Sequence, residues 1–596
     1  MTDFTTRPEI SGTFGMATST HWIASATGFG ILERGGNAFD AAVAMGLTLQ
    51  IVEPQLNGPA GEVPVLFQRP GEPVTVLCGQ GVAPAGATIA AYRALGLEMV
   101  PGSGLLATVT PGAWDAWLLL LRDQGTMTLA EVLAPAIALA RSGHPLLPRV
   151  AETIAGLADF FRDHWPTSAA VWLPGGRPPP AGALFTNPDL ADSYQRLADI
   201  ASAAKSRKAG IDAARKAWRT GFVAEAISGF CATAKVVDVT GHAHRALLSA
   251  RDLAEWQAGY EAPLSCRYGD WTVYKTGPWG QGPVLLQTLT ILEGFDLGSL
   301  DPGGPEFTHL IIEAIKLAYA DREAYYGDPL HHPVPMTTLL SPEYAASRRA
   351  LINDRANLDQ RPGHLPGLEH LAAAAVDRAA RLAGGPAGAT AGEPTMAHLT
   401  ERRGDTVHLD VIDRWGNLVS ATPSGGWLQS SPVIPGLGFA LNSRAQMFWL
   451  TEGLHSSLAP GHRPRTTLTP TLARHRNGTA LVFGTPGGDQ QDQWNLLLFL
   501  RLVHFGMGLQ QAIDAPQFHS LHMQSSFYPR LAQPGEVLME PGFSANTVAD
   551  LRARGHLITL SEPWSIGRMT AARRDPDGLL HAGATPRLMK AYAVGR

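Results

Sequence analysis

Cysteine is scarce in this chain, with three residues among 596 that lie far apart, at Cys78, Cys231 and Cys266. An odd number of widely spaced cysteines suggests neither a disulfide framework nor a CxxC metal site. We therefore expect three ordinary buried thiols.

Long apolar runs are also missing. No stretch of eighteen apolar residues occurs in the chain, so no membrane-spanning helix is predicted. Residues 1–8 lack the apolar core of a secretory signal. From these two absences we expect a cytoplasmic protein without a membrane partner.

An excess of basic residues is the third absence. The chain has 47 Lys and Arg against 52 Asp and Glu, a formal net charge of −5, and it has no basic stripe. A nucleic-acid partner is therefore not expected. The 45% of hydrophobic and 17% of charged residues are typical of a soluble globular protein, and 64 Gly with 45 Pro indicate many turns.

Three common signatures of catalytic or cofactor sites are absent as well. No G-x-S-x-G elbow occurs, which excludes the usual α/β-hydrolase arrangement. The Gly-rich segment 277–282 lacks the Lys-Ser/Thr ending of a phosphate loop, so a nucleotide is not expected. His331, His332 and the other histidines form no i, i+4 pair with a third ligand in reach, so neither a metal nor another cofactor is predicted.

What the chain does contain is a hairpin pattern that begins at a hydroxyl residue. Val407, Leu409 and Val411 alternate with other residues up to a turn at 415–417, and a returning strand is predicted at 418–422. The first strand is predicted to begin at residue 406, a threonine. A threonine at this place is usually structural, because threonine favours strands, so the context has to decide.

Thr406 gains a catalytic role if the chain is cut between Asp405 and Thr406. A threonine hydroxyl is a poor nucleophile at neutral pH, and a free α-amino group on the same residue can accept its proton. The pKa of an α-amine is near ~8, close to working pH, which suits a general base. The hypothesis therefore requires backbone cleavage at this bond.

The segment before Thr406 has the composition of a linker. Within 361–404, an Ala-rich helical stretch at 370–383 precedes a Gly- and Pro-rich stretch at 384–394. A mobile linker here would allow a new N-terminus to leave the pocket. An ordinary surface loop is the alternative.

The length of 596 residues predicts two domains by default. Apolar residues at helical spacing predict helices at 129–142 and 307–326, with charged residues on the other face. We interpret these two helices as outer helices of the fold.

Six short segments follow one another in the order of the landmarks of one enzyme family. Each is weak evidence alone. Together they resemble the γ-glutamyltransferase (glutathione hydrolase) family of the N-terminal-nucleophile hydrolase superfamily. The segments are 15–17 with 31–44, 110–112, 318–322, 327–329, 463–471 and 484–488.

The resemblance implies an α/β fold, a four-layer αββα sandwich in which both halves of the chain are interleaved. It implies a proenzyme that cuts itself into a large subunit, 1–405, and a small subunit, 406–596, which stay together as partners. It also implies roles for single residues. These are Thr406 as the nucleophile, Ser424 as its supporting hydroxyl, the Gly487 and Gly488 N–H groups as the oxyanion hole, and Thr466 and Thr467 as contacts of the substrate carboxylate.

Four positions depart from the family pattern for binding a γ-glutamyl group. Gln80 stands in place of an Arg that clamps the α-carboxylate, and a neutral amide cannot supply a charged fork. Gly426, Arg444 and Met447 replace an Asn, a Gln and an Asp that hold the α-amino group. A cation and an apolar side chain do not suit an ammonium, so γ-glutamyl groups are expected to bind poorly.

Arg444 leaves two interpretations open. It indicates an anionic acyl group, or it pairs with a nearby Asp or Glu. The interval between Phe448 and Arg463 is shorter than the lid-bearing stretch of typical relatives, and the Gly-rich loop at 54–62 is altered. A more open pocket would admit bulkier substrates.

The expected function is a self-cleaving threonine amidohydrolase that forms an acyl-enzyme on Thr406, with transfer to an acceptor less supported. Oxamate-like amides and acylated β-lactam side chains are favoured over γ-glutamyl compounds. The alternatives are an authentic γ-glutamyltransferase and, in another class, an uncleaved binding protein. The natural substrate, the acceptor and any homo-oligomer stay open.

Overall fold

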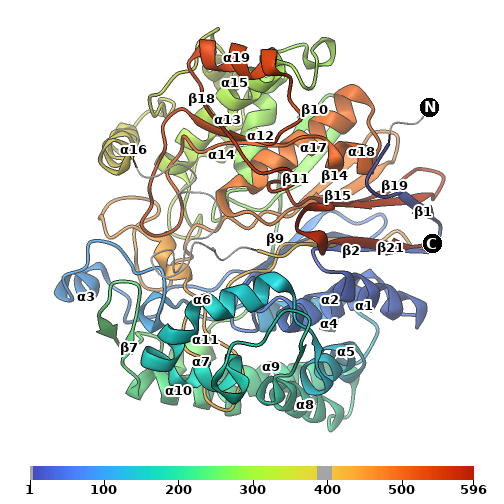
Figure 1. The fold of residues 1–596 in the computed structure, drawn as a ribbon, viewed down its shortest axis with the longest axis vertical. Helices are drawn as coiled ribbons and strands as arrows, with labels where there is room; N and C mark the ends of the chain where they lie inside the picture. Colours follow the sequence, from blue (N-terminus) through green and yellow to red (C-terminus); the bar gives the residue numbers. More distant parts are fainter. Residues whose placement is uncertain (1–3, 385–405) are drawn as a thin grey trace.

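The computed structural model describes residues 4–384 and 406–596. Figure 1 shows four stacked layers, in which two β-sheets lie face to face between two layers of helices. The α/β sandwich implied by the resemblance is therefore present. Both chain ends lie at the same edge of the sheets.

Each central sheet has seven strands and takes them from both sides of residue 406, so the two halves of the chain are interleaved. Sheet I has the order β21-β2-β12-β13-β3-β4-β9, and sheet II has the order β1-β20-β19-β15-β14-β11-β10. Neighbouring strands are antiparallel in both. The strands of sheet I are β2 (Gly15–Ser19), β3 (Val63–Gln68), β4 (Thr75–Gly79), β9 (Gly259–Glu261), β12 (Leu409–Asp413), β13 (Leu418–Ala421) and β21 (Tyr592–Gly595). Those of sheet II are β1 (Ile10–Gly12), β10 (Leu264–Tyr268), β11 (Trp271–Lys275), β14 (Thr471–His475), β15 (Ala480–Gly484), β19 (Thr570–Arg574) and β20 (Leu580–Ala584).

The predicted hairpin is present as β12 and β13, with Leu409 opposite Ala421. β12 begins at Leu409, three residues later than predicted. The hairpin register nevertheless continues before the strand, because the Val407 N–H donates to the Pro423 carbonyl. β2 pairs with the other edge of β12, so this strand lies in the interior of sheet I.

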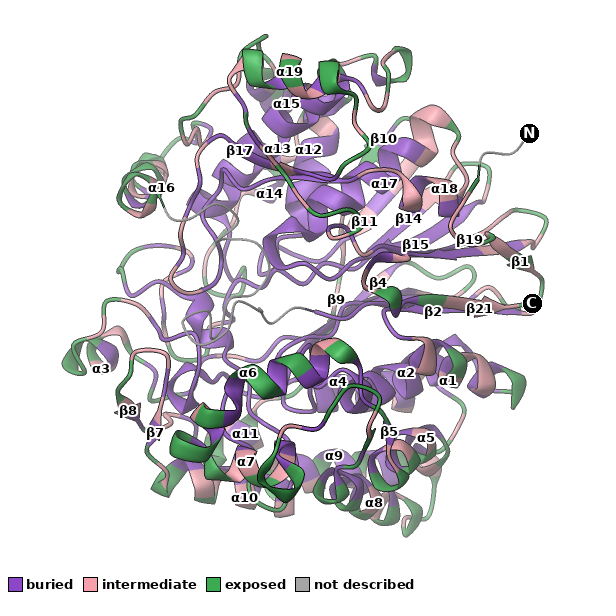
Figure 2. Ribbon diagram, in the orientation of Figure 1, coloured by how far each residue is buried: buried purple, intermediate pink, exposed green. Residues whose placement is uncertain are grey.

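Three apolar clusters hold the layers together, one between each sheet and its helices and one between the two sheets. β12 shows how one strand serves two of them. Leu409 and Val411 pack toward the helices, whereas Ile412 packs toward sheet II. Figure 2 shows buried residues throughout the sheets and on the helix faces that cover them.

Sheet I is covered by α1 (Trp22–Glu33), α2 (Ala38–Val52) and α4 (Ala113–Gln124). α2 begins at a capping box between Asn37 and Asp40. All of its residues are buried because it lies between sheet I and α5 (Leu129–Ser142). α5 confirms the predicted helix at 129–142.

Sheet II is covered by α12 (Pro283–Leu292), α13 (Pro305–Tyr325) and α17 (Gln491–Phe505). α13 is the helix predicted at 307–326 and lies in the outer helical layer over sheet II, but its charged face is not exposed. Nearly all of it is buried, and its charged residues form interior ion pairs such as Glu313 with Lys316. Helical periodicity does not reveal that other segments cover the polar face.

The segment predicted as a linker, 361–404, is ordered in its first part. The expected helical stretch is α16 (Glu369–Leu382), which packs against α13. Arg378 is buried there and donates from Nη2 to the Glu323 carbonyl at 3.0 Å. This part is a packed helix and not a linker, while 385–404 and the predicted cleavage residue Asp405 lie outside the described residues.

The other elements extend the helical layers and the loops. The three cysteines are free and buried, as expected. No helix in the described part of the chain is long and apolar enough to cross a membrane. The remaining helices are α3 (Ile89–Ala94), α6 (Pro148–His164), α7 (Pro166–Trp172), α8 (Pro188–Ser202), α9 (Arg207–Thr220), α10 (Phe222–Thr233), α11 (Ala250–Glu255), α14 (Met336–Leu339), α15 (Pro342–Arg349), α18 (Leu509–Asp514) and α19 (Ala545–Arg554). The remaining strands are β5 (His144–Pro145), β6 (Leu184–Phe185), β7 (Val236–Val237), β8 (Ala243–His244), β16 (Phe518–Ser520), β17 (Glu536–Met539) and β18 (Leu557–Leu560).

Candidate active site

Thr406 lies in a row of residues at one end of sheet I. In the β12–β13 hairpin Leu409 is opposite Ala421, so extending both strands by three residues places Thr406 opposite Ser424. The two side chains are in contact: Thr406 Oγ1 donates to Ser424 Oγ at 3.3 Å, and both residues are buried. The register of the hairpin therefore brings the two predicted hydroxyl residues together.

Glu62 and Gln80 extend this row across the next two strands. Glu62 and Ser424 exchange both backbone hydrogen bonds, at 2.9 and 3.0 Å. The β3–β4 register then places Gln80 beyond Glu62. Because neighbouring strands are about 4.8 Å apart, the backbones of Gln80 and Thr406 are separated by roughly 14 Å.

The side chain of Gln80 is turned toward its own loop, where its amide donates to the Gly81 carbonyl at 3.2 Å. Gln80 also lines a cavity of about 480 Å³ together with Trp256 and Arg463. The guanidinium in this cavity already pairs with Asp328 at 2.7 Å. A direct contact of Gln80 with an acyl group on Thr406 stays a prediction.

Arg444 lies in a single 3₁₀ turn, η4 (Arg444–Met447), and is fully buried. Its Nε donates to the Glu62 carboxylate, and its Nη2 donates to Ser424 Oγ at 2.6 Å. The guanidinium lies 4.9 Å from the ring centre of Trp427 and 5.8 Å from that of Phe527. Of the two interpretations of Arg444, the structure shows the pair with a carboxylate.

The carboxyl group of Glu62 is the partner, and its environment opposes the charge. Burial raises the pKa of Glu62 to about 7, although the Arg444 guanidinium lowers it. The Glu62 carboxyl therefore titrates near neutral pH, and it lies one strand beyond Ser424.

Neither Gly426 nor Met447 offers a polar group to a substrate amine. Met447 packs with Trp427 and Phe527 in a small apolar cluster. Gly426 has φ +66°, and its carbonyl would lie 2.3 Å from a Cβ placed on Gly58. The tight contact between these two loops explains why glycine occupies both positions.

Gly487 and Gly488 lie in the turn between β15 and α17, at the end of sheet II. Both have positive φ, +141° and +59°, which only glycine adopts readily. Neither backbone N–H donates to another described residue. The strand leading to the turn touches the Thr406 strand, because a Cβ on Gly484 would lie 2.2 Å from the His408 ring. The turn thus carries two unused donors on this side of the site, as an oxyanion hole requires.

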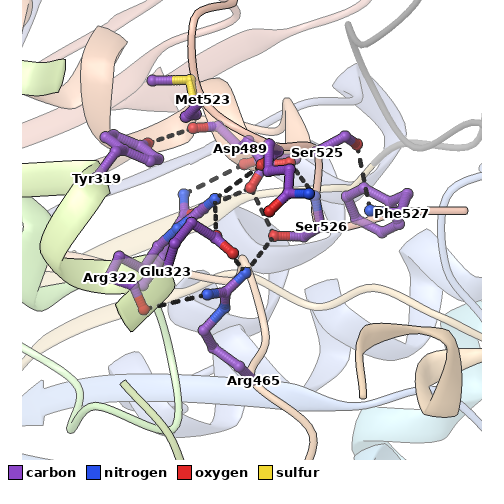
Figure 3. A network of polar contacts seen from close by, with 12 residues as sticks. Tyr319, Arg322, Glu323, Arg465, Asp489, Met523, Ser525, Ser526 and Phe527 are labelled. Atoms are coloured by element: carbon purple, nitrogen blue, oxygen red, sulfur yellow. Dashed lines mark hydrogen bonds and ion pairs between the residues drawn. The ribbon is translucent and has the colours of Figure 1, made fainter. Parts of the chain in front are cut away.

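A charged network holds this turn, as Figure 3 shows. The Asp489 carboxylate, directly after Gly488, pairs with Arg322 and accepts from the backbone N–H and hydroxyl of Ser526 at 2.8 and 2.6 Å. The Tyr319 hydroxyl donates to the Asp489 carbonyl. The turn is therefore fixed to α13, which carries both Tyr319 and Arg322.

The same network holds the segment that contains Thr466 and Thr467. Arg465 pairs with Glu323 at 2.7 Å and donates to the Arg322 carbonyl at 3.3 Å. Burial raises the pKa of Glu323, but the guanidinium groups of Arg465 and Arg322 outweigh it and lower the pKa to about 2. This carboxylate stays charged at any ordinary pH.

The two threonines differ in how their hydroxyls are used. Thr466 Oγ1 accepts from the Leu468 N–H at 3.3 Å. Thr467 Oγ1 is buried and has no hydrogen-bond partner in the described part of the chain. Gln281 links this segment to the oxyanion turn, since its N–H donates to the Thr466 carbonyl at 2.9 Å and its amide to the Gly488 carbonyl at 3.3 Å.

Comparison with known proteins agrees with this architecture. The model of the family described as gamma-glutamyltranspeptidase matches residues 24–595. The chain belongs to the gamma-glutamyltranspeptidase family. It is therefore an enzyme of the N-terminal-nucleophile hydrolase superfamily, and an amidohydrolase is the coarse activity that its relatives share.

Individual gamma-glutamyltranspeptidase relatives are similar over their whole length. The Acylase ACY 1 proenzyme of Pseudomonas sp. (strain SE83) is 31% identical over 98% of this chain and 94% of its own. A solved structure of LmbA2991 with a threonine-to-alanine substitution has a TM-score of 0.93 at 50% identity and covers 100% of both chains. The cephalosporin acylase from Bacillus halodurans has a TM-score of 0.81 at 27% identity, covering 100% of this chain and 98% of its own. Other relatives are named glutathione hydrolase and oxamate amidohydrolase.

Several residues of this gamma-glutamyltranspeptidase site were missed from the sequence. Glu62 had a signal, because it is the one charged residue in the stretch from 54 to 67. Arg322 and Arg465 lie inside segments that carried the family resemblance, yet their role in the network was not predicted. Trp427 and Phe527 had no signal, since an aromatic residue in a loop of this composition is common.

One group of metal-binding residue types occurs in the described residues, His309, Glu313 and His556. His309 and Glu313 lie on α13, and His556 follows α19; none of the three belongs to the row or to the oxyanion turn. His309 Nδ1 and His556 Nε2 share a hydrogen bond of 2.8 Å, and Glu313 pairs with Lys316 and Arg361. These partners already occupy the ligand atoms, so the group does not change the interpretation of the site.

Proposed function

We propose that this gamma-glutamyltranspeptidase relative is a self-cleaving threonine amidohydrolase whose nucleophile is Thr406. The observation that carries the proposal is the contact between the buried Thr406 hydroxyl and Ser424 Oγ at 3.3 Å, at the predicted start of the small subunit. The proenzyme names of the relatives agree with cleavage into two subunits. The partner of each subunit is the other one.

In the proposed mechanism, cleavage before Thr406 releases its α-amino group. The amine takes the hydroxyl proton as Thr406 Oγ1 attacks the amide carbonyl of the substrate, and it gives the proton to the leaving amine. The Gly487 and Gly488 N–H groups donate to the developing alkoxide, where each donor contributes about 3 kcal/mol. Water then attacks the acyl-enzyme and regenerates the hydroxyl.

The acyl group of the substrate is proposed to lack the γ-glutamyl amine. An apolar cluster is formed by Met447, Trp427 and Phe527. Gly426 has no side-chain amide that could bind an amine. Arg444 would repel an ammonium, and its charge is already paired with Glu62. Small oxamate-like amides and the acyl side chains of β-lactams fit this lining better than glutathione does.

An authentic γ-glutamyltransferase is the second candidate, and Thr467 favours it. Its buried hydroxyl is without a partner among the described residues, so it is available to a substrate carboxylate. A glutaryl group carries the same carboxylate without the amine. Comparing γ-glutamyl, glutaryl, oxamyl and uncharged acyl amides therefore separates the two candidates: efficient γ-glutamyl turnover would refute the first.

A denaturing gel tests the cleavage. The purified chain of 63.4 kDa is expected to give two bands, with Thr406 at the N-terminus of the smaller one by mass spectrometry. Thr406→Ala is expected to abolish both the split and hydrolysis, whereas Ser420→Ala, on the neighbouring strand, serves as the matched control. A single band that persists on long incubation would support the uncleaved binding protein instead.

A further inference from the structure

A buried charge pair lies directly behind Ser424, and no step of the mechanism above uses it. Glu62 and Arg444 are both about fully buried, and they are 382 residues apart in the chain. Taking two charges out of water is unfavourable, and apolar residues of similar volume often replace such a pair without loss. A pair kept beside the nucleophile therefore calls for a functional reason.

Arg444 is held on several sides, which makes its guanidinium a rigid donor. Glu62 binds its Nε, and the rings of Trp427 and Phe527 flank it. Its backbone N–H donates to Asn442 Oδ1 at 3.2 Å. The planar guanidinium fork loses little freedom when it makes a further hydrogen bond.

Glu62 is connected to Ser424 twice, which closes a ring. Its backbone pairs with that of Ser424 through two hydrogen bonds, and its carboxylate reaches Ser424 Oγ through Arg444. Any shift of Ser424 would break contacts in both connections. The hydroxyl is thus fixed in position by the pair.

The closed set of hydrogen bonds among Glu62, Arg444 and Ser424 also makes Ser424 the acceptor, and Thr406 the donor, of the hydrogen bond between them. Ser424 Oγ accepts from Arg444 Nη2 at 2.6 Å and from Thr406 Oγ1 at 3.3 Å. A hydroxyl has two acceptor lone pairs, so both are used. The Thr406 hydroxyl is therefore the donor of this hydrogen bond, and its proton points at Ser424 Oγ.

We propose that Arg444, held by Glu62, is a positioning residue that keeps Ser424 Oγ the hydrogen-bond acceptor of the Thr406 hydroxyl, above all during self-cleavage. In that step Thr406 Oγ1 bonds to the carbonyl carbon of residue 405, the peptide bond between residues 405 and 406 breaks, and the hydroxyl proton ends on the Thr406 nitrogen. The proposal rests on Thr406 as the nucleophile. Before cleavage the nitrogen of Thr406 is an amide and cannot act as a base, so the orientation of its hydroxyl depends on Ser424. After cleavage the free α-amine of Thr406 acts as the base. Loss of Arg444 therefore slows self-cleavage more than hydrolysis.

The test compares two rates in the same variants, on the full chain. We expect Arg444→Met with Glu62→Gln to slow self-cleavage by about 100-fold, which is what a misplacement of a reacting group by about 1 Å can cost. Once cleavage of this double variant is complete, its hydrolysis rate is expected to be within about 10-fold of the wild-type rate. The double variant removes both charges, so its thermal midpoint stays near that of the wild-type chain.

A second measurement separates positioning from a merely structural role. Adding Ser424→Ala to the double variant is expected to cause no further slowing of self-cleavage, because the double variant already lacks the contacts that position the Ser424 hydroxyl. Arg444→Lys is expected to fall between the wild type and the double variant, since an ammonium cannot serve Glu62 and Ser424 with one planar fork. This variant keeps a charge and provides the readout if the double variant does not fold.

Two results would overturn the proposal. One is self-cleavage of the double variant within about 3-fold of the wild-type rate, and the other is a multiplication of the Ser424→Ala and Arg444 effects. Failure of the wild-type chain to split, or splitting of Thr406→Ala, would instead refute the proposed function.

Discussion

The two halves of the candidate site are both built on buried charges, but the charges are used differently. At the end of sheet I one carboxyl, Glu62, faces Arg444, and burial raises its pKa to about 7. At the end of sheet II Glu323 faces both Arg322 and Arg465, and despite burial its pKa falls to about 2. The difference lies in the number of guanidinium groups around each carboxylate.

The comparison separates a scaffold from an adjustable group. The low pKa of Glu323 keeps it charged at every ordinary pH, so the network around it can hold the oxyanion turn without change. The pKa of Glu62 is raised to about 7, and Glu62 pairs with Arg444, which donates to Ser424. Perturbed groups of this kind are more often part of the chemistry than of the scaffold.

The largest expected effect is the loss of stability when the Glu323 carboxylate is removed. We expect Glu323→Gln to lower the free energy of unfolding by about 3–5 kcal/mol, because it leaves Arg322 and Arg465 buried with less compensation. Urea denaturation in the uncleaved Thr406→Ala chain measures the change. The control is Glu452→Gln, which breaks an exposed pair with Arg93 and is expected to cost less than about 0.5 kcal/mol.

A decrease in the free energy of unfolding of less than about 1 kcal/mol for Glu323→Gln would contradict the scaffold interpretation, because a buried charge that loses its partner destabilises a protein by more than that. It would mean that the two arginines find other partners when the carboxylate is removed.

Contacts of the candidate site could be predicted from the sequence where the two residues are close together in the chain, and not where they are far apart. The hairpin was predictable, and its register alone brings Thr406 to Ser424. For Arg444 the sequence left open a pair with an Asp or Glu. That the partner is Glu62 was not predictable, because the contact needs the pairing of β13 with β3 and the placement of η4.

Helical spacing also misled where burial is complete. It located α13 correctly, but it assigned the charged residues to an exposed face, because periodicity carries no information on ion pairs inside the protein. The family resemblance supplied the layer order, which composition and spacing could not.

The second prediction concerns pH, because Glu62 and Glu323 change the stability of the protein in opposite directions as the pH rises. The folded pKa of Glu62 is raised from 4.5 to about 7, so its stabilising contribution is present below about 4.5 and is lost as pH rises toward 7. Glu323 has a folded pKa lowered to about 2, so its contribution is present above about 4.5 and is lost as pH falls.

As the pH rises from 5 to 8, the free energy of unfolding of the Glu62→Gln variant should therefore increase relative to that of its parent. At about 1.36 kcal/mol per pKa unit the full window is worth about 3 kcal/mol. Urea denaturation of the uncleaved Thr406→Ala chain, with and without Glu62→Gln, measures the difference across this range. A flat difference for Glu62→Gln would place its folded pKa near the ordinary value.

The smallest expected effect separates the two threonines that the network positions. Thr466→Val removes the acceptor of the Leu468 N–H and leaves a buried donor unpaired, which costs about 1–2 kcal/mol. Thr467→Val removes a buried hydroxyl that has no partner in the described chain, so the stability is expected to stay the same or to rise by up to about 1 kcal/mol. If Thr467 serves a substrate carboxylate, the same variant should raise KM for a glutaryl amide and leave KM for an uncharged acyl amide unchanged. A loss of stability in Thr467→Val equal to that of Thr466→Val would show that its hydroxyl has a structural partner, and the substrate role would then lose its support.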